Sequence, residues 1–142
     1  DESSYSATPS AATLRTLLVV AQSLNIVVAI GDCAQAFLQA PLLEKEGIWV
    51  APPIEADANP GCAWRLLKTL PGLKGVPSAW GQHATQLKKE LYNLTPSEYD
   101  QCVYGDAKRK LWTMRHMDDY LFVVPAVEVK MLTDDMSRTL LL

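Results

Sequence analysis

The sequence predicts an α+β fold in which an antiparallel sheet packs on helices. Helical and β-branched segments follow one another in the order helix, strand, hairpin, helix, hairpin, helix. The strand segments come in pairs across turns, which favours antiparallel pairing. The 142 residues, 49% hydrophobic and 20% charged, suit one globular domain with one core.

The first helix and the first strand come from the start of the apolar region. Leucine and alanine recur at helical spacing over residues 11–23, with Ser10 placed as the N-cap. The dense β-branched run in 26–33 predicts a buried central strand that ends near Asp32. Polar residues interrupt this region, so it falls short of a membrane-spanning helix.

The middle of the chain predicts a hairpin and a long helix. Residues 47–51 form a strand that two prolines stop, and residues 62–68 are its partner strand. After a turn punctuated by glycine and proline, residues 78–93 carry an apolar stripe at helical spacing. Lys88 is assigned to the solvent-facing side of this helix.

The last third supplies most of the sheet. Short strands are predicted at 101–106 and 110–117 around a charged turn, and at 120–124, where Pro125 ends the strand. Residues 126–141 read as a closing helix.

Residues 1–10 are polar and predicted to be loose, which leaves 11–142 as the folded domain. The chain starts with Asp and stops inside a predicted helix, so we expect a piece of a longer polypeptide, truncated at both ends. The three cysteines have no CxxC spacing and favour reduced thiols in an intracellular protein, not a secreted one. The net charge of −3 gives no electrostatic argument for nucleic acid.

Two adjacent aspartates, Asp118 and Asp119, sit between two apolar segments. One interpretation is a solvated hairpin turn, because short carboxylates bond to nearby backbone amides. The other is a divalent-metal site, since magnesium takes one or two carboxylates together with substrate phosphates. Asp32, at the end of a predicted strand, offers a third carboxylate, although a lone aspartate there is normally a cap or turn residue.

A resemblance to a known family favours the metal site. Four stretches carry it, in order: DCAQAFLQAPLLEKEGIWVAPP (32–53), RLLKTLPGLKGVPSAW (65–80), YDQCVY (99–104) and HMDDYLFV (116–123). They resemble successive blocks of the reverse transcriptase domain of copia-type retrotransposon Pol polyproteins. The resemblance covers nearly the whole chain and implies a polymerase palm, which is ferredoxin-like, with part of the fingers.

The resemblance implies an RNA-directed DNA polymerase that transfers nucleotides onto a primer 3′-hydroxyl. Asp32 and Asp118 would bind two Mg²⁺ ions, for which Mn²⁺ can substitute, and Asp119 would support the site. Two-metal catalysis needs ions roughly 4 Å apart, so carboxylates from distant parts of the chain must converge.

The resemblance also assigns binding residues around these carboxylates. The nucleotide-binding positions are Phe37, Gly72, Lys74 and Pro77, and the primer-positioning positions are His116 and Met117. From the residues alone, a core side chain is the preferred interpretation of Phe37, because phenylalanine is commonly buried. Gly72 and Pro77 read equally as turn and helix-start residues.

The implied partners are an RNA or DNA template with its primer, deoxynucleoside triphosphates, and the rest of the Pol polyprotein with its integrase and ribonuclease H. No membrane partner is expected. The family pattern is broken where His116 replaces tyrosine, Gly75 replaces glutamine and Ser78 replaces arginine. We therefore keep the alternative of a decayed or domesticated non-catalytic fragment, and expect the isolated chain to be inactive. A metal-dependent phosphohydrolase ranks last because no general base is evident.

Overall fold

The computed structural model describes residues 6–42 and 47–139. Its elements run along the chain as follows: α1 (Ala11–Leu24), β1 (Val27–Asp32), α2 (Ala36–Gln39), β2 (Trp49–Val50), the 3₁₀ helix η2 (Ile54–Ala56), β3 (Trp64–Arg65), α3 (Val76–Tyr92), β4 (Val103–Asp106), β5 (Leu111–His116), β6 (Asp119–Val124) and α4 (Ala126–Thr139). The predicted α+β class with an antiparallel sheet is confirmed. Parts of three predictions, at 1–5, 43–45 and 140–141, lie outside the described residues.

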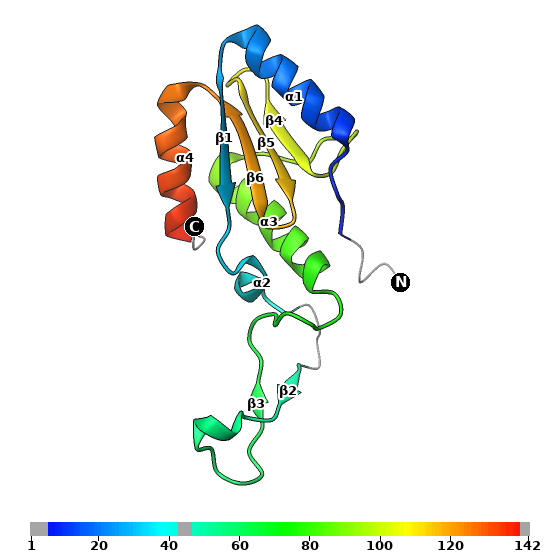
Figure 1. The fold of residues 1–142 in the computed structure, drawn as a ribbon, viewed down its shortest axis with the longest axis vertical. Coiled ribbons are helices and arrows are strands. Elements are labelled where there is room, and N and C mark those ends of the chain that lie inside the picture. Colours follow the sequence, from blue (N-terminus) through cyan, green and yellow to red (C-terminus); the bar gives the residue numbers. More distant parts are fainter. Residues whose placement is uncertain (1–5, 43–46, 140–142) are drawn as a thin grey trace.

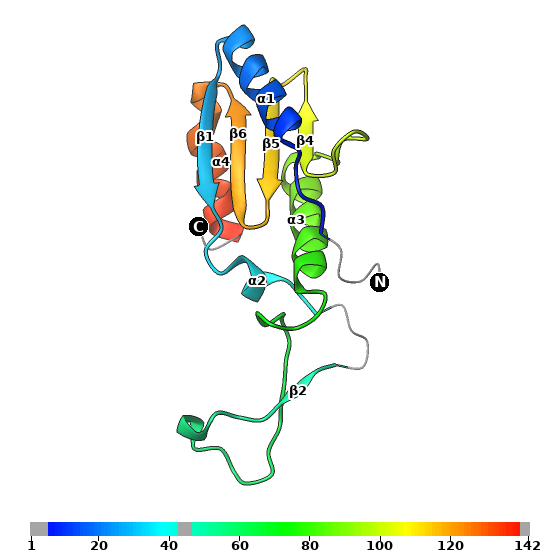
Figure 2. The ribbon, with the colours of Figure 1, turned by 45° about the vertical axis from the view of Figure 1, so that its right-hand side comes forward.

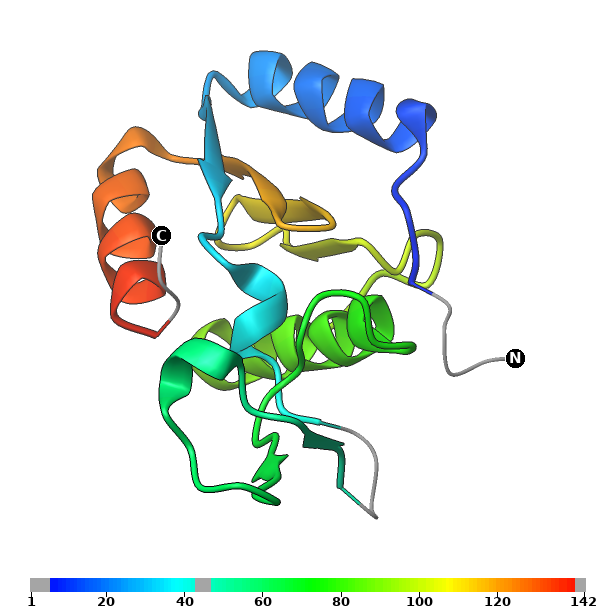
Figure 3. The same cartoon turned by 60° about the horizontal axis from the view of Figure 1, so that its bottom comes forward.

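The central sheet has four antiparallel strands in the order β1-β6-β5-β4 (Figure 2). Figure 3 shows α1 on one side of this sheet and α3 on the other. The core divides in the same way, because strand side chains alternate between the two faces. Tyr120 and Phe122 of β6 pack with α3 and α4, whereas Leu121 and Val123 pack with α1.

The connection of the strands follows part of a ferredoxin-like order. The elements that match this order along the chain are β1, α3, β5, β6 and α4. Within the sheet, β6 lies between β1 and β5. β4 extends the sheet beyond β5, and no strand among the described residues pairs with the outer edge of β1. The helix and strand order therefore agrees with the predicted palm-like half, with β4 added.

Local sequence signals explain where the first helix begins and ends. The Thr13 amide donates to the Ser10 hydroxyl over 3.0 Å, which confirms the predicted N-cap. Asn25 adopts a left-handed conformation at the other end, with φ of 52°, and closes the helix before β1. No helix in the described ranges is long and apolar enough to cross a bilayer.

The β2–β3 hairpin projects away from the main sheet (Figure 1). Only two residue pairs form its ladder, Trp49 with Arg65 and Val50 with Trp64. The pairing of the two predicted segments is confirmed, but the strands are much shorter than predicted. Pro52 and Pro53 come directly after Ala51 and lack amide hydrogens, so the ladder cannot continue through them.

Two predictions about burial are wrong. β1 is not a buried central strand: it lies at the sheet edge, and Ile30 is 78% exposed. Lys88 was assigned to the solvent side of its helix, yet it is 5% exposed. Lys88 lies four residues after Ala84 and eight after Trp80, and these spacings place all three on one face of α3, toward the sheet.

Candidate active site

The three predicted carboxylates gather at one end of the β1–β6 pair. Asp32 is the last residue of β1, and its Cα partner across the ladder is Asp119, the first residue of β6. The Cys33 amide donates to the Asp118 carbonyl over 3.0 Å, which continues the pairing into the hairpin turn. Directly opposed residues have Cβ atoms about 4.5–5.5 Å apart, so the pairing brings these like charges together.

The carboxylates are accessible. Asp32 and Asp119 are exposed, and Asp118 is half-buried. Asp119 also lines a cavity of about 510 Å³ between the start of α1 and the sheet, together with Ile30 and His116. A substrate group can therefore approach the strand end without any rearrangement of the fold.

Burial and the negative charges of this site raise the pKa of Cys33, which follows Asp32 directly. Its thiol is 1% exposed, and its pKa is raised to about 11. Burial is the largest cause, followed by the negative charge of Asp32 and, further down, that of Asp118.

The β5–β6 turn is tight and holds a strained residue. His116 pairs with Asp119, so only Met117 and Asp118 form the loop. Met117 has φ of 59°, a left-handed conformation that costs a residue with a Cβ roughly 1–2 kcal/mol. Two-residue hairpins with a positive φ at the first loop position favour glycine there. The sequence instead places a methionine, so the turn carries strain next to the carboxylates.

Relieving this strain gives a first testable prediction. Met117→Gly is expected to raise the free energy of unfolding by about 1 kcal/mol, because glycine adopts positive φ without penalty. Met117→Ala keeps the strain and loses the side-chain contacts, so it should be less stable than the glycine variant. Urea unfolding of the three proteins measures the order. A glycine variant less stable than the alanine variant would show that the turn is unstrained.

Trp80 of α3 makes a hydrogen bond to this turn. Its side chain is fully buried, and its indole N–H donates to the Met117 carbonyl over 2.7 Å. The Arg115 guanidinium donates to the same carbonyl over a longer distance, 3.4 Å. Sequence reasoning assigned Trp80 to packing and missed the hydrogen bond, because nothing in the sequence pairs a helix indole with a particular carbonyl.

Phe37 lies in α2, a short helix that follows the Asp32 end of β1. It is half-buried and packs against the core cluster of α3 and the sheet. Its carbonyl accepts a hydrogen bond from the Thr69 hydroxyl, and the Thr69 amide donates to Ala40 over 2.9 Å. These contacts support the interpretation of Phe37 as a core side chain, and its role toward a nucleotide stays a prediction.

The predicted nucleotide-binding loop leads from β3 into α3. Gly72 has φ of 98°, a conformation that favours glycine, and Pro77 stands in the first turn of α3. Lys74, between them, is exposed. Figure 1 shows this loop next to α2, on the side of the sheet where β1 and the β5–β6 turn end. Turn chemistry accounts for the glycine and the proline, whereas the exposed lysine is available to an anion.

The donor set determines what metal the strand end can hold. Within residues 6–42 and 47–139, no three His, Cys, Asp or Glu side chains are arranged to hold a metal ion together. A pair of carboxylates remains at the strand end, which fits magnesium, because that ion commonly takes one or two carboxylates and completes its shell with water and phosphate oxygens. A structural zinc site does not fit, since it needs four protein ligands.

Comparison with known proteins gives one family. A family model described as reverse transcriptase (RNA-dependent DNA polymerase) matches residues 3–140. No curated protein and no solved structure matches the chain. The matched range contains all of the described helices and strands and all three carboxylates.

Proposed function

The chain belongs to the reverse transcriptase family, and from this premise we propose that it is the RNA-directed DNA polymerase domain of a copia-type retrotransposon. The observation that carries the proposal is the pairing of Asp32 with the Asp118–Asp119 turn across β1 and β6. The reaction would be nucleotidyl transfer onto a primer 3′-hydroxyl. Its partners would be a template with primer, deoxynucleoside triphosphates, and the remaining Pol domains.

Each residue at the strand end has a proposed part. Asp32 and Asp118 would hold Mg²⁺, or Mn²⁺ in its place, and Asp119 would add negative charge beside them. When bound, the ions lower the pKa of the attacking hydroxyl and neutralise charge on the leaving pyrophosphate. The hydrogen bond from Trp80 to the Met117 carbonyl would hold in place the turn that carries Asp118.

The surrounding residues would position the two substrates. His116 and Met117, on the turn, would support the primer end. Phe37 and the loop with Gly72, Lys74 and Pro77 would contact the incoming nucleotide, with Lys74 as the exposed cation for its phosphates.

The second candidate is a domain that keeps this fold without polymerising DNA. It is supported by a donor set limited to carboxylate pairs in the described ranges, and by the replacements at His116, Gly75 and Ser78. This alternative is a decayed or domesticated fragment that catalyses nothing, and it does not require metal binding.

Metal titration by calorimetry tests the proposal. The purified chain is expected to bind Mn²⁺ and Mg²⁺ saturably, and Asp118→Asn to weaken binding by at least about tenfold, since loss of a direct ligand should cost no less than loss of an outer-shell partner. Asp57→Asn is the matched control, because Asp57 is exposed on the distant β2–β3 hairpin.

Primer extension by a longer Pol protein that contains this chain separates the two candidates, because the isolated chain is expected to be inactive under both. Metal binding together with extension supports the polymerase, and metal binding without extension supports the non-catalytic domain. A folded chain with no saturable metal binding, or with equal affinity in the Asp118 variant, would contradict the polymerase and favour the non-catalytic fragment.

A further inference from the structure

A buried arginine near the β5–β6 turn has no counter-ion among the described residues. Arg115 of β5 is 3% exposed and lies between the sheet and α3. Its Nη1 reaches only the Met117 carbonyl, at 3.4 Å, and its Nε has no hydrogen-bond partner. In the part of the chain that the structure describes, no carboxylate forms an ion pair with this guanidinium.

For an arginine, loss of the proton is not a way to avoid the cost of a buried charge. Its guanidinium stays charged in proteins, and a buried charge is strongly unfavourable unless it is paired. Lys88, also buried behind the same sheet face, shows the contrasting behaviour. Burial is the main cause that lowers its pKa well below the usual value, and the charge of Arg115 lowers it further. The lysine can become neutral, but the arginine needs an anion.

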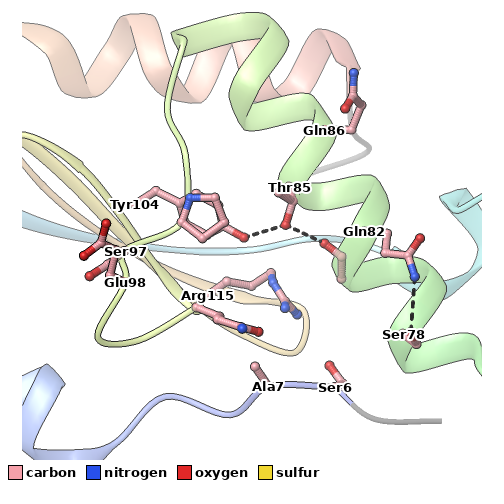
Figure 4. Close-up of a pocket in the computed structure, with 13 residues that line it drawn as sticks. Ser6, Ala7, Ser78, Gln82, Thr85, Gln86, Ser97, Glu98, Tyr104 and Arg115 are labelled. Atoms are coloured by element: carbon pink, nitrogen blue, oxygen red, sulfur yellow. Dashed lines mark hydrogen bonds between the residues drawn. The ribbon is translucent and has the colours of Figure 1, made fainter. Parts of the chain in front are cut away.

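A cavity adjoins the guanidinium. It has a volume of about 650 Å³ and lies between α3, the loop before β4 and the segment before α1. Figure 4 shows the Arg115 side chain between Thr85 and Gln82 of the helix and Ser6 of the N-terminal segment. None of the three candidate catalytic carboxylates lines this cavity.

Among the described residues that line the cavity, Arg115 is the charged hydrogen-bond donor. The Thr85 hydroxyl donates to the Gly81 carbonyl over 2.9 Å, so the Tyr104 hydroxyl donates to Thr85 over 2.7 Å, and both protons are used (Figure 4). The Ser6 hydroxyl is buried without a partner. Glu98 lines the cavity as well, but it is exposed and makes no ion pair with Arg115.

We propose that this cavity binds a small ligand with an oxyanion group, a phosphate or a carboxylate, through the Arg115 guanidinium and the Ser6 hydroxyl. A planar guanidinium matches both groups in two-point hydrogen bonding. The cavity of about 650 Å³ has room for a small free anion, whereas the near-complete burial of Arg115 leaves little of the guanidinium open to a polymer backbone. The test of the proposal does not depend on polymerase activity, because none of the three candidate catalytic carboxylates lines the cavity, although Arg115 also contacts the Met117 carbonyl of the β5–β6 turn.

The test follows the Arg115 Nε–H signal by NMR while inorganic phosphate, succinate or a single-stranded DNA oligonucleotide is added at constant ionic strength. Arg115→Met keeps most of the aliphatic volume, assigns the signal by its loss, and should weaken binding at least tenfold. Arg15→Met is the matched control, because Arg15 is exposed on α1, and it should bind as the parent does.

A saturable shift with phosphate or succinate supports the proposal, and the tighter of the two identifies the group. No saturable shift with either, or a shift with the oligonucleotide alone, overturns it. So does equal thermal stabilisation of the parent and Arg115→Met by phosphate, which would mark a general salt effect. If that variant does not fold, the signal in the parent decides. Binding seen only after Asp1 and Glu2 are both neutralised would assign the cavity to the chain's own carboxylates and also overturn the proposal.

Discussion

Replacing Trp80 with alanine is expected to lower the free energy of unfolding by about 3–5 kcal/mol, the range typical of removing a buried aromatic side chain. Trp80 is fully buried in the core cluster that joins α3 to the sheet. The substitution also removes the indole donor of the Met117 carbonyl. The loss therefore combines a cavity at the centre of the domain with a released turn at the candidate active site.

Trp80→Phe separates these two effects. Phenylalanine fills much of the space but cannot donate, which leaves the Met117 carbonyl with the longer Arg115 contact. We expect a loss of about 1–3 kcal/mol for the lost hydrogen bond and the smaller ring. Hydrogen exchange in the β5–β6 turn should rise in both variants. Trp49→Ala is the control, because Trp49 is 61% exposed on the projecting hairpin and its loss should change stability by no more than about 0.5 kcal/mol. Urea unfolding that ranks Trp80→Ala with the control would contradict the packing described here.

The elements of this fold are predictable because local signals agree with the tertiary structure. Helical spacing and the Ser10 cap locate α1, and the β-branched and aromatic runs locate β5 and β6. The convergence of Asp32 with the hairpin aspartates was expected from the resemblance and the needs of two-metal chemistry, and the β1–β6 register brings them together. Their catalytic roles stay predictions.

The sheet order could not be predicted from local signals. The residues of β1 resemble a buried strand, yet an edge position depends on which distant segments pair. β6 pairs with β1 on one side and with β5 on the other, so β1 is left at the edge with Ile30 uncovered. The composition of a strand indicates whether its side chains could be buried. Whether they are buried depends on pairing with segments that lie far away in the sequence, here across about 90 residues.

The buried cations were missed although the spacing contained the signal. Lys88 continues the face of Trp80 and Ala84, and Arg115 follows Leu111 and Thr113 at every second position of β5. Residue type argued for solvent in both cases, because lysine and arginine are rarely buried without a partner. Here periodicity gives the correct face and residue type does not, and that conflict marks the two positions as unusual.

The second large effect is expected at Lys88. Lys88→Met should raise the free energy of unfolding at pH 7 by about 1–4 kcal/mol, as replacements of buried charged groups by apolar residues often do. The Lys88 ammonium lies 4.6 Å from the Tyr104 ring centre and 4.1 Å from that of Tyr120. Such contacts contribute about 2 kcal/mol when desolvated, less than the several kcal/mol needed to bury an ammonium. The pKa of Lys88 is lowered well below its usual value, with burial as the main cause and the charge of Arg115 as the next, so we expect the cost of burial to exceed what the two rings return.

The gain should depend on pH with a definite sign. Between the lowered pKa of Lys88 in the folded state and its usual value of 10.5, the unfolded chain holds a proton that the folded chain lacks, so the stability contributed by this site rises with pH. The methionine variant has no such term, so its advantage over the parent is largest at low and neutral pH and shrinks as the pH approaches 10.5. Urea unfolding at intervals from pH 6 to 10 measures the difference, with Lys89→Met, an exposed neighbour, as the control that should show no trend. A methionine variant that is less stable than the parent at pH 7, or a difference that does not change with pH, would mean that Lys88 stays charged in the core and that the two tyrosine rings suffice to hold it there.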